Sequence, residues 1–225
     1  SLEPESAATL QSTLVDTLEG LEGLGAILEK ADLIAVDTET TDTDVMKARL
    51  VGISLAVQPG HGYYIPVGHQ QGQQLSINEV FRVLSGPLTV PKIGKAGHNL
   101  KYDYLVLKRA GLAISPLRFD TMIAEWLINP ASRNLGLKNL AWVRLGYEMT
   151  QIEALIGKGR GQKTMDEVPI SEAADYAAAD AAIVLQLIPL LQADLRQQEA
   201  EDLFNTLEMP LIPVLAAMEE AGILL

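Results

Sequence analysis

The stretch Leu33–Thr41, with the sequence LIAVDTETT, joins a short apolar run to two carboxylates that are separated by one residue. The apolar run predicts a buried central strand over Leu33–Asp37. Side chains at positions i and i+2 of a strand point to the same face, so Asp37 and Glu39 project together and Thr38 projects to the other face. Carboxylates held so close repel each other, and one takes up a proton unless a cation lies between them. The pair therefore predicts either a site for a hard divalent cation, which prefers oxygen ligands, or a solvated strand end.

The composition is sufficient for one substantial hydrophobic core. The chain has 225 residues, of which 48% are hydrophobic, enough for one core alone or with a helical appendage. The sequence contains no cysteine, which excludes disulfides, thiolate catalysis and zinc-finger sites and is consistent with an intracellular protein. We find neither an apolar run of the ~18 residues that a membrane span needs nor a signal peptide. The segment Ser1–Gln11 is small, polar and acidic, and we expect a linker or tail there.

The charge balance argues against nucleic-acid binding when it is taken alone. The formal net charge is −12 at pH 7, whereas phosphates are bound by Lys and Arg. Basic residues nevertheless cluster in two parts of the chain, at Lys92, Lys95, Lys101, Lys108 and Arg109, and at Lys158, Arg160 and Lys163. A nuclease that holds divalent cations also needs acidic residues. The charge therefore makes a nucleic-acid partner less expected without excluding it.

The order of predicted elements indicates an α/β fold with a mixed sheet flanked by helices. Short apolar runs predict strands over Ser12–Asp16, Leu33–Asp37, Leu50–Val57, Tyr63–Val67 and Lys92–Gly97. Helical spacing predicts helices over Leu18–Lys30, Val80–Leu84, Tyr102–Ala110, Thr121–Leu127, Leu137–Leu145, Ser171–Gln197 and Leu203–Glu220. A turn at Pro59-Gly60 makes residues 50–67 a hairpin, and Pro210 and Pro213 are expected to kink the last helix.

A second polar segment, GHNLKYD, covers Gly97–Asp103. Asn99 and Asp103 are four residues apart, at or near the start of a predicted helix. They are either a helix cap and a first-turn charge, or further members of the carboxylate site.

A third segment, DYAAADAAIVLQL, covers Asp175–Leu187. Tyr176 and Asp180 are at positions i and i+4 of a predicted helix and so share one face. Asp180 lies beside the apolar stripe of that helix, where a charge needs a partner that a cation would supply. The alternative is an aspartate on the flank of the helix that faces water.

Together the three segments have the order D-x-E, N-x-x-x-D and Y-x-x-x-D, which resembles the motifs of the DEDDy class of 3′–5′ exonucleases. Longer segments resemble the proofreading domain of bacterial family A DNA polymerases, namely VDTETT, LVGISLAVQPGHGYYIPVGH, GHNLKYDYLVLKRAGL, FDTMIAEWLINP, GKG and YAAADAAIVLQL. The resemblance covers the chain from about Ser12 to its end. The hairpin segment and FDTMIAEWLINP are specific to this branch and distinguish it from ribonuclease D-like and Werner-type relatives.

The resemblance implies a ribonuclease H-like fold and a two-metal site for hydrolysis. It implies that Asp37, Glu39, Asp103 and Asp180 hold two divalent ions, Mg²⁺ or Mn²⁺, with Zn²⁺ as an alternative at one site. Asp37 would bridge the ions, Glu39 and Asp180 would complete the site on the nucleophile side, and Asp103 would serve the leaving-group side. Tyr176 would position the attacking water. The products would be deoxynucleoside 5′-monophosphates, released from the 3′ end of single-stranded DNA.

Thr38, Asn99 and Lys101 are the candidates for substrate binding, and the loop 158–163 offers further phosphate contacts. One departure from the family is Thr43, because relatives often carry a leucine there that packs against the terminal bases. Val45 or Met46 are alternatives for that contact. We therefore expect the metal site to be better defined by the sequence than the contacts with DNA.

The resemblance also implies a domain division and partners. Residues 12–200 would form the exonuclease domain, and residues 201–225 a helix that leads into a polymerase domain of the same full-length chain. The implied protein is a cytoplasmic, nucleoid-associated monomer without a membrane partner. Two alternatives are a ribonuclease D-like enzyme that trims RNA and a catalytically silent structural module. The presence of all four carboxylates and Tyr176 argues against the silent module.

Overall fold

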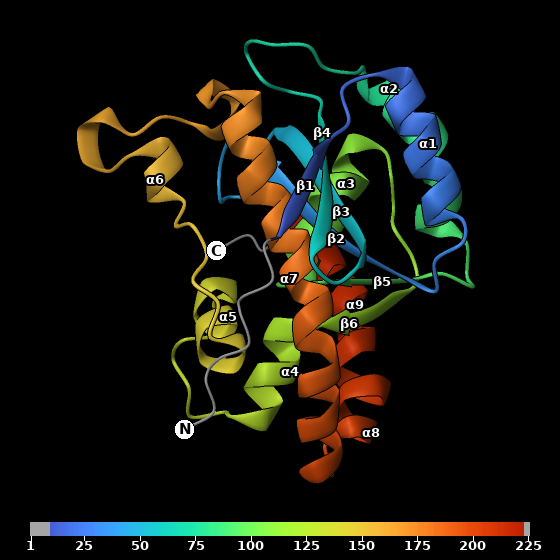
Figure 1. Cartoon of the computed structure of the whole chain (residues 1–225). Coiled ribbons are helices and arrows are strands. Elements are labelled where there is room, and N and C mark those ends of the chain that lie inside the picture. Colours follow the sequence, from blue (N-terminus) through green and yellow to red (C-terminus); the bar gives the residue numbers. More distant parts are fainter. Residues whose placement is uncertain (1–9, 223–225) are drawn as a thin grey trace.

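The computed structural model describes residues 10–222 and shows a six-stranded mixed sheet between two layers of helices (Figure 1). The strands are β1 (Gln11–Leu14), β2 (Leu33–Thr40), β3 (Leu50–Gln58), β4 (His61–Pro66), β5 (Gly94–Gly97) and β6 (Leu117–Asp120). Their order is β1-β4-β3-β2-β5-β6, in which β2, β3 and β4 are antiparallel neighbours and the other pairs are parallel. The predicted α/β fold is confirmed. The predicted tail lies largely outside the described residues, and Gln11 already belongs to β1.

Helices cover both faces of this sheet. They are α1 (Leu18–Leu28), α2 (Ile77–Thr89), α3 (Leu100–Ala110), α4 (Thr121–Ile128), α5 (Leu137–Leu145), α6 (Glu153–Ile156), α7 (Ile170–Gln197), α8 (Glu201–Leu203) and α9 (Met209–Ala221). In Figure 1, α7 crosses one face, and α1 and α2 lie on the other side of the sheet. The core is divided in the same way, because Ile34 and Val36 of β2 pack with α1, α2 and α3, whereas Ala35 packs with α7. Because successive side chains of a strand point to opposite faces, β2 contributes residues to two hydrophobic cores.

β2 is longer than predicted, and this extension positions the acidic pair. The strand continues to Thr40, so that Asp37 and Glu39 are paired residues of the sheet, opposite Ser54 and Gly52 of β3. Their side chains follow Ala35 onto the face that α7 covers. The register shifts between Glu39 and Thr40, at the point where the strand ends.

α7 approaches the sheet closely because the residues in contact are small. Its inner face carries a run of buried alanines, Ala173, Ala174, Ala177, Ala178, Ala181 and Ala182. A Cβ placed on Gly62 of β4 would lie 2.0 Å from the carbonyl oxygen of Ala178. This close packing brings Tyr176 and Asp180 to the end of β2.

By length and composition alone, α7 is also apolar enough to cross a membrane. In the structure, 67% of its most apolar window is buried inside the protein. The helix is therefore explained as the central core helix of the fold.

Two predictions about local structure were incomplete. β6 was missed because the charged residues Arg118 and Asp120 interrupt its apolar residues, so that no apolar run marks the strand. The last predicted helix is divided, since residues Phe204–Glu208 form a π-helical turn between α8 and α9. This turn directly precedes Pro210, which lacks the N–H that an α-helical turn requires. The kinks expected at Pro210 and Pro213 stay predictions.

Gly62→Ala is expected to destabilise the protein by about 1–3 kcal/mol, because the added methyl group forces α7 away from β4. Urea unfolding measures the change. Gly23→Ala is the matched control, since Gly23 lies in α1 and a Cβ there has no atom within 4 Å. We expect the control to be neutral or slightly more stable. Equal stability of the two variants would show that α7 does not depend on this close contact.

Candidate active site

Three carboxylates from two elements converge beside the end of β2. Asp37 and Glu39 come from β2 and Asp180 comes from α7, and one oxygen of each lies within 4.8 Å of the others. Glu39 and Asp180 are buried, with 7% and 8% of their surface exposed. The sequence predicted this convergence only through the resemblance, because nothing in the spacing of 141 residues between Glu39 and Asp180 indicates it.

Asp103 reaches the same region from the opposite face of the sheet. It lies in the first turn of α3 and is 3% exposed. The Thr38 hydroxyl donates a 2.7 Å hydrogen bond to its Oδ1 atom. Asp103 is outside the group of three carboxylates, yet its charge is close enough to raise the pKa of Asp37. Thr38, a predicted substrate contact, therefore has a structural partner in Asp103.

Burial and mutual repulsion make this cluster resist ionisation. Burial raises the pKa of Asp37 well above its ordinary value, and the charges of Asp103, Glu39 and Asp180 raise it further. Burial likewise raises the pKa of Glu39 and Asp180. For Asp103 burial raises the pKa to about 7, although hydrogen bonds from Thr38 oppose the shift. A divalent cation would favour the ionised forms of all four groups.

The donor atoms of the cluster fit hard divalent cations. All are carboxylate oxygens, the ligands that Mg²⁺ and Mn²⁺ prefer. Ser54 is directly opposite Asp37 on β3, and opposite residues of an antiparallel pair point to the same face. The Ser54 hydroxyl is the one buried side-chain polar atom of residues 10–222 without a hydrogen-bond partner. An unsatisfied donor beside a carboxylate pair is consistent with a site that is completed by a bound ion and its water.

Tyr176 lies one helical turn before Asp180 on α7, as predicted. The Lys138 ammonium of α5 is 4.1 Å from the centre of its ring and also pairs with the Asp180 carboxylate. Sequence reasoning did not identify Lys138. A lysine on a helix ordinarily indicates a solvated face, and its partner is 42 residues further along the chain.

Asp120 is a second residue that the sequence analysis missed. It ends β6, is 1% exposed, and accepts hydrogen bonds from the backbone N–H groups of Asn99 and Leu100 at the start of α3. It also caps α4. An aspartate directly before the apolar run TMIAEWLI is the signal that would have indicated this cap.

Asn99 does not act as the alternative helix cap through its side chain. It occupies the N-cap position of α3 with φ 60°, and its side chain makes no capping hydrogen bond. Left-handed backbone at a non-glycine residue is uncommon and is often associated with functional sites. The carboxylate of Asp120 takes the capping role instead.

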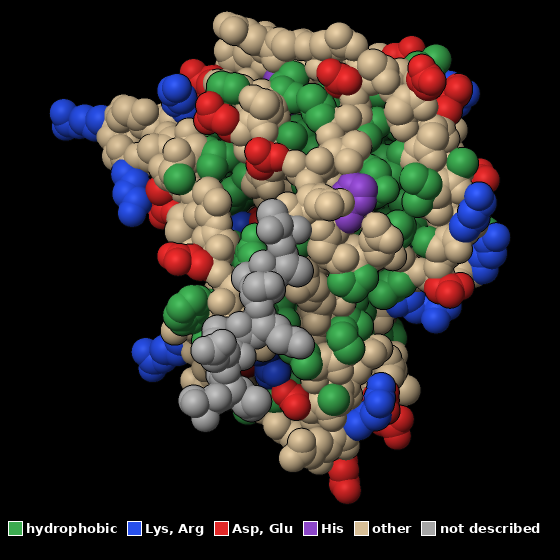
Figure 2. All heavy atoms as spheres, in the orientation of Figure 1, with side chains coloured by type: hydrophobic (Ala, Val, Ile, Leu, Met, Phe, Trp, Pro, Cys, Tyr) green, Lys and Arg blue, Asp and Glu red, His purple; other side chains and the backbone are tan. Residues whose placement is uncertain are grey.

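The basic residues that we predicted to contact the substrate lie in different surroundings. Lys101 forms a 2.5 Å ion pair with Glu219 of α9. Lys158 is 79% exposed, 4.0 Å from Glu153. Figure 2 shows basic side chains projecting at the loop that leads from α6 to α7. Of the predicted basic residues, Lys163 in this loop borders the groove next to Glu39.

That groove has a volume of about 340 Å³ and begins at Glu39. One wall is the segment 39–43, and the other contains Ile152, Ile156 and Lys163. Thr43, at the position where the resemblance led us to expect leucine, therefore faces the groove. Val45 does not replace it, because Val45 is 4% exposed and packs with residues of α3 and α9.

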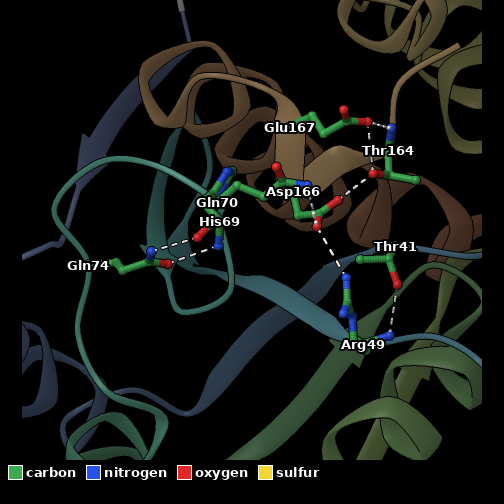
Figure 3. A network of polar contacts seen from close by, with 8 residues as sticks. All are labelled: Thr41, Arg49, His69, Gln70, Gln74, Thr164, Asp166 and Glu167. Carbon is green, nitrogen blue, oxygen red and sulfur yellow. Dashed lines mark hydrogen bonds and ion pairs between the residues drawn. The ribbon is translucent and has the colours of Figure 1, made fainter.

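The loop beside the groove is anchored through Asp166 (Figure 3). The Asp166 carboxylate accepts a 3.2 Å hydrogen bond from Arg49 and a 3.1 Å hydrogen bond from Gln70. The backbone N–H of Gln70 donates to the Asp166 carbonyl, and the Thr164 hydroxyl donates to the carboxylate. These contacts fix the loop carrying Lys163 against the segments that flank β3 and β4.

The family described as 3′–5′ exonuclease matches residues 12–196. The chain belongs to this family. DNA polymerase I of Chloroflexus aurantiacus is 42% identical over 214 residues, covering 94% of this chain and 22% of the relative. The chain thus spans about a fifth of the curated relatives that it matches.

Solved structures show the same ribonuclease H-like exonuclease fold. NrnC of Brucella melitensis has a TM-score of 0.71 at 21% identity, with 95% of this chain and 94% of that chain covered. RNase D of Escherichia coli, described as an exoribonuclease involved in structured RNA processing, has a TM-score of 0.71 at 20% identity, covering 95% of this chain and 52% of that one.

In EDTA, the melting temperature is expected to fall as the pH rises from about 4 to about 8. The pKa of Asp103 is raised from 3.8 to about 7 and those of its neighbours are also raised, so the folded state binds more protons than the unfolded state within this window. Stability is therefore lost as the pH rises through the window. Mn²⁺ is expected to reverse the loss, because it binds the ionised carboxylates.

Asp37→Asn tests whether the carboxylate cluster causes this pH dependence of the melting temperature. The substitution removes one charge from the cluster and keeps the shape of the side chain. We expect the variant to melt higher than the parent in EDTA at pH 8 and to respond little to Mn²⁺. Asp32→Asn, at an exposed position, is the control with the same change in charge. A parent protein with equal melting temperatures at both ends of the pH range would refute the explanation.

Proposed function

We propose that the chain is a proofreading exonuclease domain that hydrolyses the 3′-terminal phosphodiester of single-stranded DNA with two divalent ions, Mg²⁺ or Mn²⁺. The convergence of Asp37, Glu39 and Asp180 with Tyr176 at one end of β2 carries this proposal. The relation to DNA polymerase I supports DNA as the substrate. The products are deoxynucleoside 5′-monophosphates.

The residues of the site divide the tasks of this reaction. Asp37, Glu39 and Asp180 would hold an ion on the nucleophile side, and Asp103 would serve the leaving-group side from α3. When bound, divalent ions would supply stabilisation of the charge on the attacking and leaving oxygens and would lower the pKa of the attacking water. The Tyr176 hydroxyl orients the attacking water. Burial raises the pKa of this hydroxyl far above its ordinary value, so it remains a neutral hydrogen-bond donor and acceptor.

The groove that begins at Glu39 is the proposed binding site of the terminal nucleotide. Ile152 and Ile156 offer apolar surface for a base, and Lys163 offers a cation for a phosphate. Asn99 lies at the left-handed start of α3, four residues before Asp103, and remains a proposed contact for the nucleotide. With Lys101 bound to Glu219, the proposed role of that lysine is to link α3 to α9.

The proposed domain organisation follows the same relation. Residues 12–200 would form the exonuclease domain, and the segment from 201 onward would lead into a polymerase domain. Its described part, 201–222, packs into the common core through Phe204, Met209 and Ile212. The last three residues of the predicted helix, 223–225, lie outside the described residues. The partners of the domain would be a DNA 3′ end and the polymerase part of a longer chain.

Mn²⁺ or Mg²⁺ is expected to support the release of mononucleotides from a single-stranded DNA oligonucleotide labelled at its 3′ end. Asp37→Ala should lower the rate at least about 1,000-fold, because a bound ion contributes several kcal/mol to transition-state stabilisation. Tyr176→Phe should lower kcat about 100-fold and leave the Mn²⁺-induced rise in melting temperature unchanged.

The same assay separates the alternatives. An RNA oligonucleotide of equal sequence that is degraded faster than the DNA would indicate a ribonuclease D-like enzyme. Activity that persists in excess EDTA, or in Asp37→Ala, would refute the metal-dependent mechanism. A parent protein without activity on either substrate and without stabilisation by Mn²⁺ would indicate a structural module.

Thr43→Leu is expected to lower KM for the DNA oligonucleotide severalfold and to change kcat little. The added side chain contributes apolar surface opposite Ile152 and Ile156, and one buried side chain is worth about 1–2 kcal/mol when only part of it is covered. Steady-state kinetics measures both constants. An unchanged KM would show that the bases do not lie in this groove.

A further inference from the structure

Lys138 is a cation inside the carboxylate cluster, and the proposed chemistry assigns it no task. It comes from α5, and its ammonium pairs with Asp180 Oδ1. The side chain is only 19% exposed, and that of Asp180 is 11% exposed. The same ammonium lies 4.1 Å from the centre of the Tyr176 ring. One lysine therefore contacts both residues that α7 contributes to the site.

The charge of Lys138 acts on the whole cluster. It lowers the pKa of Asp37, Glu39 and Asp180, against the effect of burial. Burial lowers the pKa of the nearby His98 to about 4, and the charge of Lys138 contributes to this shift, so that the histidine is neutral. Removing one partner of a buried ion pair is strongly destabilising, because the other charge is left uncompensated.

An ammonium and a divalent ion compete for the same carboxylate. Asp180 Oδ1 already accepts a hydrogen bond from Lys138, and a dication beside that oxygen would repel the ammonium. The aromatic face of Tyr176 gives the ammonium a second favourable contact, which does not depend on Asp180. Lys138 can therefore keep its contact with Tyr176 when an ion binds the Asp180 carboxylate.

We propose that Lys138 is an internal counter-ion that holds the metal-free cluster together and gives up Asp180 to the divalent ion. It is a positioning residue that acts through Asp180 and Tyr176. It keeps the three converging carboxylates from separating before the ion arrives, and it raises the metal concentration at which the site fills. The inference rests on the proposed metal-dependent function.

Thermal melts at pH 8, in EDTA and along a Mn²⁺ titration, test the proposal with four proteins. These are the parent, Lys138→Met, Lys138→Arg and Lys92→Met. Methionine keeps an unbranched chain of similar length over Tyr176 and removes only the charge. Lys92 is exposed, so its substitution makes the same change in net charge away from the cluster.

Lys138→Met should melt several degrees lower than the parent in EDTA, and its Mn²⁺ midpoint should fall about 3-fold to 10-fold, because the competing cation is gone. Lys138→Arg should retain the melting temperature of the parent in EDTA. Lys92→Met should retain both the melting temperature of the parent in EDTA and its Mn²⁺ midpoint. A Lys138→Met midpoint equal to that of the parent, or an equal shift in Lys92→Met, would overturn the proposal.

A double variant covers the case in which Lys138→Met is too unstable to titrate. Lys138→Met combined with Asp180→Asn removes both charges, and we expect it to regain the melting temperature that Lys138→Met loses in EDTA. A double variant as unstable as the single one would contradict the pairing. A parent that shows neither stabilisation by Mn²⁺ nor release of mononucleotides would instead refute the proposed function.

Discussion

Like charges crowded into a buried space are the constraint on which the rest of the structure depends. Asp37, Glu39 and Asp180 place oxygens within 4.8 Å of one another, and burial removes the water that would screen them. Such a cluster is unfavourable for folding, so rigid surroundings must hold it. The alternation of β2 between two hydrophobic cores and the close contact of α7 with Gly62 provide that rigidity.

The site is supported from both faces of the sheet. On the α7 face, the carboxylates meet Lys138 and the unsatisfied hydroxyl of Ser54. On the other face, Thr38 holds Asp103, and Asp120 ties the start of α3 to the end of β6. Thr38 fixes the Asp103 carboxylate, and Asp120 fixes the backbone at the start of the helix that carries Asp103. This support explains why the carboxylates stay in place despite their raised pKa values.

Much of the fold could be predicted from the sequence, because long periodic segments determine it. The apolar runs of β2 and β3 and the helical spacing of α5 and α7 gave those elements to within a few residues. β6 and the π-helical turn at Phe204–Glu208 were not predicted, since charged residues interrupt the apolar residues of β6 and a π turn depends on packing. Within the site, the i and i+2 and i and i+4 rules paired Asp37 with Glu39 and Tyr176 with Asp180. Lys138 required the tertiary structure, because no local rule connects α5 with α7.

In the proposed reaction, substrate choice depends on a different part of the molecule from the chemistry. The fold is shared with NrnC and with RNase D at about 20% identity, so the fold by itself does not select DNA. The residues that can select lie beside the cluster, in the groove between 39–43 and the wall formed by Ile152, Ile156 and Lys163. A wall that contacts bases through apolar side chains distinguishes nucleotides by stacking and shape. Discrimination between DNA and RNA requires a contact at the ribose 2′-hydroxyl. The polar backbone and side chains around Thr41 and Thr43 are on the opposite wall, and under the proposed function we expect contacts with the sugar to be made there.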